Sequence, residues 1–135
     1  MQLLLDINGN MKNKKIGKLN RARGQNYERK LVNELKEITR NENLCTSRSE
    51  SKKLDNAKID IADPDNILCF YVQAKATQAT PPIKKINDEV GLKDKPLVIF
   101  WNAQEARETK QISKGEYCIL PKSFFYELIK PLYNK

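Results

Sequence analysis

The chain has 135 residues, 39% of them apolar, and a formal net charge of +8. This length suits one domain with a single hydrophobic core. The sequence contains no histidine, which excludes Ser-His-Asp and Cys-His catalysis, a histidine general base and histidine-ligated zinc. Any chemistry must therefore use carboxylates, amides and lysines, the groups that bind hard cations such as Mg²⁺.

The positive charge is concentrated near the start of the chain. Six basic residues and no acidic one lie between Lys12 and Arg23, whereas the rest of the sequence carries a net charge of only +2. We expect residues 1–23 to form a flexible basic arm, with Met11 as an alternative start, and residues 24–135 to form a single domain. Such an arm suits a polyanionic partner, because neutralised phosphates release counterions. A solvated, disordered leader is the alternative.

The sequence shows no sign of a membrane segment. No apolar run approaches the roughly 20 residues that cross a bilayer. The first ten residues also lack the charged start and cleavage site of a secretory signal peptide. We therefore expect a cytoplasmic protein.

From Gly24 onward the sequence predicts alternating helices and strands. Tyr27, Leu31, Leu35 and Ile38 recur at helical spacing, which predicts a helix over residues 25–39. Three strand candidates follow, and the last two surround an Asp-Pro-Asp-Asn turn that predicts a hairpin. These strand candidates cover residues 44–48, 58–62 and 67–76.

The second half of the chain predicts a helix, two strands and a final helix. The order α-β-β-β-α-β-β-α predicts an α/β fold with a mixed β-sheet flanked by helices. The run PLVIFW is the candidate central strand, because it is apolar on both faces. The expected elements are a helix over 82–89, a strand over 96–101, a polar connection over 102–114, a strand over 117–120, and a helix from Pro121 that ends or kinks at Pro131.

Polar residues interrupt the strand predicted over residues 67–76. Gln73 and Lys75 share one face of it, because successive strand residues point to opposite faces. A hairpin puts Asp60 on that face too, but two pairs short of Gln73, so contact requires a larger loop or a bulge. With that shift, Asp60, the Gln73 amide oxygen and the Ala74 carbonyl would hold a divalent cation beside Lys75. The alternative is a solvated sheet face without an ion.

The order of these residues resembles the PD-(D/E)XK nuclease superfamily, which has the restriction-endonuclease-like fold. The nearest likeness is to the small Holliday junction resolvases of archaea and their phage-borne relatives. The resemblance covers about residues 24–101, and the tail after Asn102 matches only as a strand followed by a helix. The segments that carry it are GQNYERKLVNELKE, TSRSESKK, KIDIA, VQAKAT and KPLVIFW.

The resemblance implies a Mg²⁺-dependent endonuclease, with Mn²⁺ as a possible substitute, that cleaves branched DNA such as four-way junctions. It implies metal ligation by Asp60 and Gln73, a supporting carboxylate at Glu28 that is a further candidate ligand, and a catalytic lysine at Lys75. These four residues are the candidate catalytic set. A phage-encoded protein of this kind would act in the cytoplasm of its host.

The resemblance also implies contacts with DNA and with a second copy of the chain. Symmetric cleavage of a junction requires two active sites, which a homodimer supplies. Trp101, Phe124, Phe125 and Tyr126 are candidates for the dimer interface, or alternatively belong to the core. The candidate DNA contacts are Ser47, Arg48, Lys52, Lys53 and Lys58, and in the arm Lys18, Arg21 and Arg23.

Two departures from the family pattern bear on activity. Ile59 precedes the aspartate where the pattern has proline, which is a minor variation. Gln73 replaces an acidic residue and so removes one negative charge from the ion site, which lowers the expected affinity for the metal. The alternatives are therefore a nuclease of the same fold acting on linear, flap or specific DNA, a catalytically weakened DNA-binding protein, and a basic structural or RNA-associated protein with a fortuitous motif.

Overall fold

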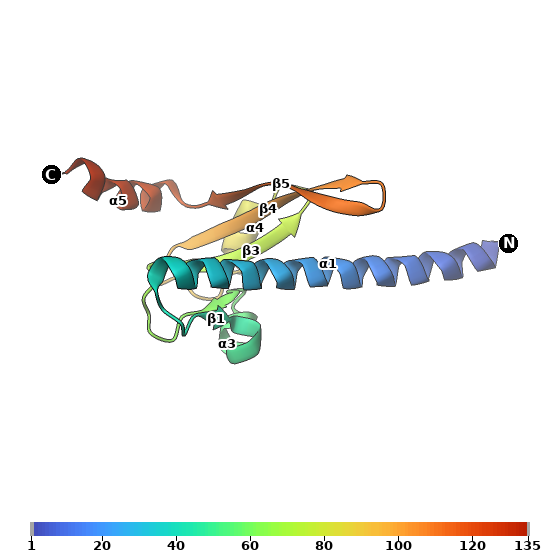
Figure 1. The fold of residues 1–135 in the computed structure, drawn as a ribbon, viewed down its shortest axis with the longest axis horizontal. Helices are drawn as coiled ribbons and strands as arrows, with labels where there is room; N and C mark the ends of the chain where they lie inside the picture. Colours follow the sequence, from blue (N-terminus) through green and yellow to red (C-terminus); the bar gives the residue numbers. More distant parts are fainter. Residues whose placement is uncertain (1, 135) are drawn as a thin grey trace.

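The computed structural model describes residues 2–134, without the side chains of residues 2–16 and Ser49. Figure 1 shows the longest helix, α1, running alongside a twisted sheet, with α5 extending beyond its carboxyl-terminal end. The elements are α1 (Gln2–Thr39), β1 (Cys45–Thr46), α2 (Ser47–Glu50), α3 (Lys52–Asn56), β2 (Ile61–Ala62), β3 (Tyr71–Thr77), α4 (Ile83–Glu89), β4 (Leu97–Arg107), β5 (Lys110–Ile119) and α5 (Lys122–Tyr133).

The main sheet has three strands in the order β3-β4-β5. β3 and β4 are parallel and are joined through α4, whereas β4 and β5 form an antiparallel hairpin. β1 and β2 pair separately as a short antiparallel ribbon. The predicted α/β class, with a mixed sheet flanked by helices, is therefore confirmed. Two short helices between β1 and β2 are additions to the predicted order.

The core has two parts, one on each face of the main sheet. On the α1 face, Tyr27 and Leu31 pack with Val72 of β3 in one buried cluster. On the α4 face, Ile86 packs with Ile99 of β4 in another. Burial of each large apolar side chain stabilises the fold by about 1.5–3 kcal/mol. The predicted apolar stripe of α1 is thus confirmed, except that Ile38, at its end, is 77% exposed.

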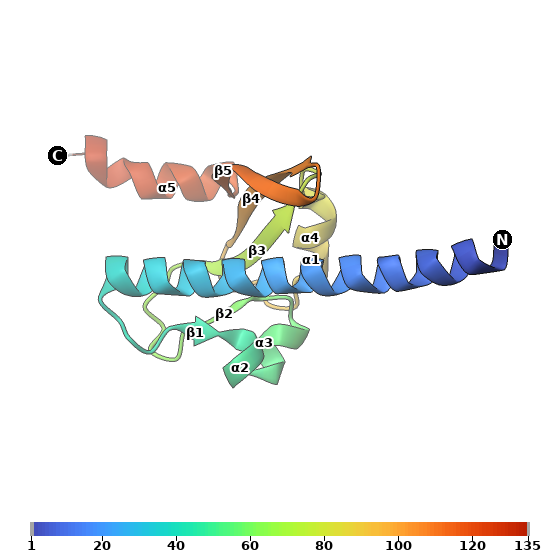
Figure 2. The ribbon, with the colours of Figure 1, turned by 45° about the vertical axis from the view of Figure 1, so that its right-hand side comes forward.

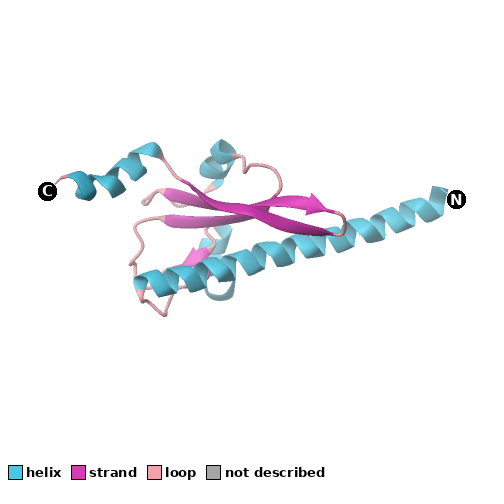
Figure 3. Ribbon diagram, turned by 45° about the horizontal axis from the view of Figure 1, so that its top comes forward, coloured by secondary structure: helices cyan, strands magenta, loops and turns pink. Residues whose placement is uncertain are grey.

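α1 is much longer than predicted, because it begins at Gln2 and not at about Gln25. The segment that carries the six basic residues is helical, consistent with the good intrinsic helix propensity of Lys, Arg, Leu and Ala. Figures 1 and 3 show that this amino-terminal half extends beyond the sheet, on the same side as the tip of the β4–β5 hairpin. The division into an arm and a domain at residues 23 and 24 stays a prediction.

The strands also differ from the predicted ones. β2 pairs with β1, and its predicted hairpin with β3 is reduced to one backbone hydrogen bond from Asp60 to Val72. The predicted strand over 44–48 ends at Thr46, because the chain turns into α2. The predicted polar connection over 102–114 is instead most of the β4–β5 hairpin. Its strands project beyond the core and are largely polar, so their sequence lacks the apolar alternation that marks a half-buried strand.

α5 begins after Pro121 as predicted and continues through Pro131 to Tyr133. None of its residues is buried. Figure 2 shows it at the end of the molecule opposite the amino terminus of α1. Within the part of the chain that the structure describes, no helix is both long enough and apolar enough to span a membrane.

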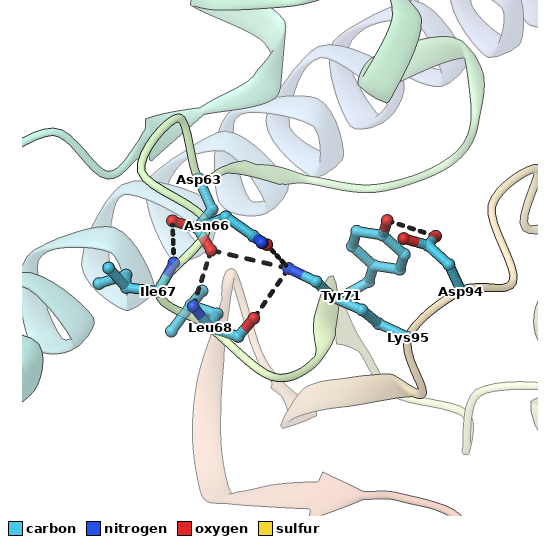
Figure 4. A network of polar contacts seen from close by, with 7 residues as sticks. All are labelled: Asp63, Asn66, Ile67, Leu68, Tyr71, Asp94 and Lys95. Atoms are coloured by element: carbon cyan, nitrogen blue, oxygen red, sulfur yellow. Dashed lines mark hydrogen bonds and ion pairs between the residues drawn. The ribbon is translucent and has the colours of Figure 1, made fainter.

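A network of polar contacts fixes the loop between β2 and β3 (Figure 4). The Asp63 carboxylate accepts bonds from the backbone N–H groups of Ile67 and Leu68, which closes the predicted turn. The ammonium group of Lys95 donates to the Asn66 side chain and to the Leu68 carbonyl, and lies 3.9 Å from Asp63. Lys95 therefore joins the segment before β4 to the loop before β3.

Replacement of Lys95 by methionine tests this network. Lys95→Met leaves the Leu68 carbonyl and the Asp63 carboxylate without their cationic partner, so we expect the free energy of unfolding to fall by about 1–3 kcal/mol. Urea denaturation measures the change. Lys84→Met, in an exposed position on α4, should alter stability by less than about 0.5 kcal/mol, and equal effects of the two variants would contradict the role of Lys95.

Candidate active site

Asp60 lies directly beside the edge of β3, level with Gln73. Its backbone N–H donates to the Val72 carbonyl at 2.9 Å, and its Oδ2 accepts a bond from the Ala74 N–H at 2.8 Å. Gln73 is the residue between these two partners. The connection between β2 and β3, residues 63–70, is longer than the predicted four-residue turn, and this larger loop brings Asp60 opposite Gln73 as the candidate ion site requires.

Gln73 carries the most unusual polar atom of this region. Its residue is 8% exposed, and its Oε1 is buried without a hydrogen-bond partner, which no other side-chain oxygen or nitrogen in the described part of the chain shows. A buried polar atom left unpaired costs about 1–3 kcal/mol. Such an atom requires a partner from outside the chain, which is either an ordered water or a bound ligand.

The backbone of β3 adds a further oxygen to this region. The Tyr71 N–H bonds to the Pro96 carbonyl, so odd-numbered residues of β3 bond toward β4. The even-numbered residues then present their backbone groups at the opposite edge, where Asp60 lies. The carbonyl of Ala74, a predicted ion ligand, is therefore directed toward the edge that Asp60 occupies.

Lys75 is the cation nearest to this edge along β3. It is half-buried, and no ion pair involves it among the described residues. It lines a cleft of about 420 Å³, together with Asn20 and Gly24 of α1 and Gln111 of β5. The ammonium group thus lies where a ligand can reach it from solvent.

Opposing effects of burial and of nearby cations act on the pKa of Asp60. Burial raises the pKa of its carboxyl group above the ordinary value, because the ionised form loses water. The hydrogen bond from Ala74 and the charges of Lys75 and Arg48 oppose this shift in pKa. The carboxylate is therefore the group that a bound cation would stabilise most directly.

Glu28 supplies a second carboxylate from α1. It is 7% exposed, and its Oε1 lies 3.1 Å from Nη2 of Arg48. Burial, together with the negative charge of Asp60, raises the pKa of Glu28 to about 7, although the charge of Arg48 opposes the rise. Glu28 and Asp60 are thus close enough to interact, but Glu28 is already paired with a cation.

The donor set fits one hard cation with few protein ligands. Among the residues whose side chains are described, no group of three or more His, Cys, Asp or Glu could hold a metal ion. The available oxygens are the Asp60 carboxylate and the unpaired Gln73 amide. The Glu28 carboxylate is near enough to Asp60 to interact with it electrostatically. Mg²⁺ suits this set, because it keeps several waters and requires only one or two carboxylates.

Ser47 does not occupy the position that its predicted role requires. Its side chain is 1% exposed, its Oγ donates to the Ile59 carbonyl, and its N–H donates to the Asp60 carbonyl. Ser47 therefore anchors the segment that carries Asp60, and it is not available to a phosphate in this structure. No pattern in the sequence indicates this anchoring role, because a serine beside an arginine fits a phosphate contact equally well.

The other candidate DNA contacts lie on α1, on α2, on α3 and just before β2. Arg48 pairs with Glu28 but its side chain remains about half exposed. Arg23 is half-buried on α1 and bonds to Asn20. The remaining candidates are exposed, on α1, on α3 and just before β2: Lys18, Arg21, Lys52, Lys53 and Lys58.

Sequence reasoning missed the residues that line the cleft beside Lys75. Asn20 and Gly24 fell at the boundary of the expected flexible arm, and Gln111 fell in an expected loop. No pattern in the sequence joins them, since they come from α1 and from β5.

Comparisons with known proteins assign this chain to no family. No protein-family model, no curated protein and no solved structure matches it. The residues and geometry described above, with the resemblance in residue order, are therefore the basis for a proposed function.

Glu28→Gln tests the electrostatics of the site. Because the pKa of Glu28 is about 7 in the fold against 4.5 ordinarily, the protein loses stability as the pH rises through that interval. Glutamine does not ionise, so we expect the variant to be more stable than the wild type by about 2–3 kcal/mol at about pH 8, and equal to it near pH 4. Urea denaturation at both pH values measures this; the exposed Glu37→Gln is the control, and a gain independent of pH would contradict the assignment.

Proposed function

We propose that this chain is a metal-dependent, structure-specific DNA endonuclease of the Holliday junction resolvase type, acting in the cytoplasm. The single observation that supports it best is the buried, unpaired Gln73 Oε1, on the strand residue that lies between the two backbone partners of Asp60. Two oxygen ligands beside a lysine form a set that hydrolysis of a phosphodiester can use. A solvated sheet face does not explain why the amide is buried.

The residues have separable roles in this reaction. Asp60 and Gln73 present their oxygens to the cation, and the Ala74 N–H holds the Asp60 carboxylate in place. When bound, Mg²⁺ supplies Lewis-acid polarisation of the phosphate and lowers the pKa of a water. Lys75 orients or deprotonates the attacking water, or stabilises the charge that develops on the phosphate. The products are a 5′-phosphate and a 3′-hydroxyl.

Glu28 and Arg48 form an ion pair that supports these residues. Their ion pair neutralises the second carboxylate, so that Asp60 remains the main negative charge facing a ligand. The half-exposed guanidinium of Arg48 also provides a donor for a phosphate oxygen. Arg48 can therefore contact both Glu28, next to the proposed cation site, and a phosphate of the bound DNA.

The exposed basic residues support DNA as the partner. They lie on the projecting half of α1 and on α3, and contacts of this kind position a phosphate backbone without reading sequence. Recognition by DNA shape fits a substrate defined by branching.

The exposed apolar residues of α5 support a homodimer. Phe125, Tyr126 and Leu128 are each about half exposed, whereas Phe124 is partly buried and contacts Phe70. A 12-residue helix without buried residues is marginal alone. Packing against a second copy would cover this face and supply the second active site.

A DNA-binding protein without catalysis is the second candidate, and one observation favours it. Gln73 is neutral, so the site offers one unpaired carboxylate for the cation where the family pattern offers two. The affinity for Mg²⁺ falls with the number of charged ligands. Retained binding to junctions without cleavage in Mg²⁺ or Mn²⁺ would identify this case.

Asp60→Asn tests the proposed cleavage. Asparagine still accepts the hydrogen bond from Ala74, so the fold should persist, whereas loss of the charge should slow cleavage of a labelled four-way junction in Mg²⁺ by at least about 100-fold. Gel assays on junction, flap and linear duplex substrates measure the rates. Asp88 is exposed on α4, so the control variant Asp88→Asn should cut at the wild-type rate. Cleavage by Asp60→Asn at that rate, or cleavage in EDTA, would contradict the proposal.

Gln73→Glu tests the cation site directly. The substitution restores a carboxylate at the unpaired amide, so we expect Mn²⁺ to bind about 10-fold more tightly or better, and the metal-free variant to be less stable than the wild type because two buried carboxylates repel each other. Calorimetric titration with Mn²⁺ and thermal melting with and without the ion measure both effects. Gln104→Glu adds the same charge to β4 away from Asp60; equal Mn²⁺ affinities of both variants would exclude a cation at Gln73.

A further inference from the structure

The cleft beside Lys75 has walls from three distant parts of the chain. α1 contributes Asn20 and Gly24, the end of β3 contributes Ala74 to Gln78, and β5 contributes Gln111. Its volume of about 420 Å³ lies within the range of roughly 300–1,000 Å³ that holds small ligands in proteins. A single nucleotide is a ligand of this size, whereas an intact duplex is far too wide to enter.

The chemistry of the lining suits a nucleotide. The cleft has one cation, Lys75, and three amides, Asn20, Gln78 and Gln111, and its described lining includes no acidic residue. A cation attracts a phosphate, and amides present both donors and acceptors, as the edges of unpaired bases require. α1, which forms one wall, also carries the six basic residues between 12 and 23 toward its amino terminus.

A neighbouring cleft, also lined by residues of α1, suits a nucleotide less well. Its volume is about 230 Å³, and it is lined by Arg23, Lys30 and Asn102, among others. Lys30 is already paired with Glu116 at 2.6 Å, so an acidic group stands beside that cleft. Among the described residues, Arg23 bonds only to the neutral Asn20, so its charge remains available at the boundary between the two clefts.

We infer that the cleft between α1, the end of β3 and β5 holds an unpaired nucleotide of the DNA strand that is cut. This rests on the proposed function, and it adds that one nucleotide next to the scissile phosphate leaves its base pair when the branched DNA binds. Lys75 contacts the phosphate at the mouth of the cleft, and the amides contact the base. Duplex arms remain outside, on the basic half of α1.

The glycines of α1 provide a matched test. Gly24 lines the cleft, and a side chain added there meets open space; Gly17, on the same helix but outside the cleft, has open space too. Leucine at either position should leave the fold intact and favour the helix. Gly24→Leu alone should fill the cleft.

Fluorescence anisotropy with a short labelled single strand, in EDTA, measures binding without cleavage. We expect Gly24→Leu to bind the strand about 10-fold more weakly, and Gly17→Leu to bind as the wild type does. A blunt duplex should bind all three proteins equally, and melting temperatures should not fall. Because the assay requires no metal, this loss in Gly24→Leu would support the cleft even if the wild type cut no DNA.

Two results would overturn the inference. One is wild-type affinity of Gly24→Leu for the single strand, and the other is an equal loss in both glycine variants, which would indicate an effect on α1 as a whole. Cleavage of junctions by Gly24→Leu at the wild-type rate, together with unchanged strand binding, would leave the nuclease proposal intact and exclude the cleft.

Discussion

The pair of hydrogen bonds between Asp60 and β3 determines how the rest of the site is arranged. One bond joins backbone to backbone at Val72, and the other joins the Asp60 carboxylate to the backbone at Ala74. Together they align a side chain from an irregular segment with the edge of a regular strand. The anchoring by Ser47 on one side and the Lys95 network on the other both fix segments that lead into this contact. Without it, the buried amide of Gln73 would have no carboxylate beside it.

Gln73 puts a neutral amide next to Asp60 along β3. Two carboxylates at this edge would repel each other strongly in the absence of a cation, whereas a carboxylate and an amide do not. A glutamate at position 73 would therefore destabilise the protein without a cation. The raised pKa of Glu28 shows the same repulsion, since the charge of Asp60 contributes to it across the interior.

Much of the fold could be predicted from the sequence because its core follows periodic patterns. The stripe of Tyr27, Leu31 and Leu35 and the apolar run of β4 gave the correct elements and the correct class. The partner of β2 could not be predicted, since two buried residues carry no register information. The β4–β5 hairpin was missed because polar strands beyond the core lack alternation. Likewise, the order of Glu28, Asp60, Gln73 and Lys75 suggested a site, but the ion pair of Glu28 with Arg48 depends on packing that no spacing reveals.

The continuity of α1 has a mechanical consequence. The 38 residues from Gln2 to Thr39 form one helix without a break. Its carboxyl-terminal half is fixed in the core and carries Glu28, while its amino-terminal half projects as a lever arm. A force on the projecting half would therefore act on the same helix that presents Glu28 to Arg48.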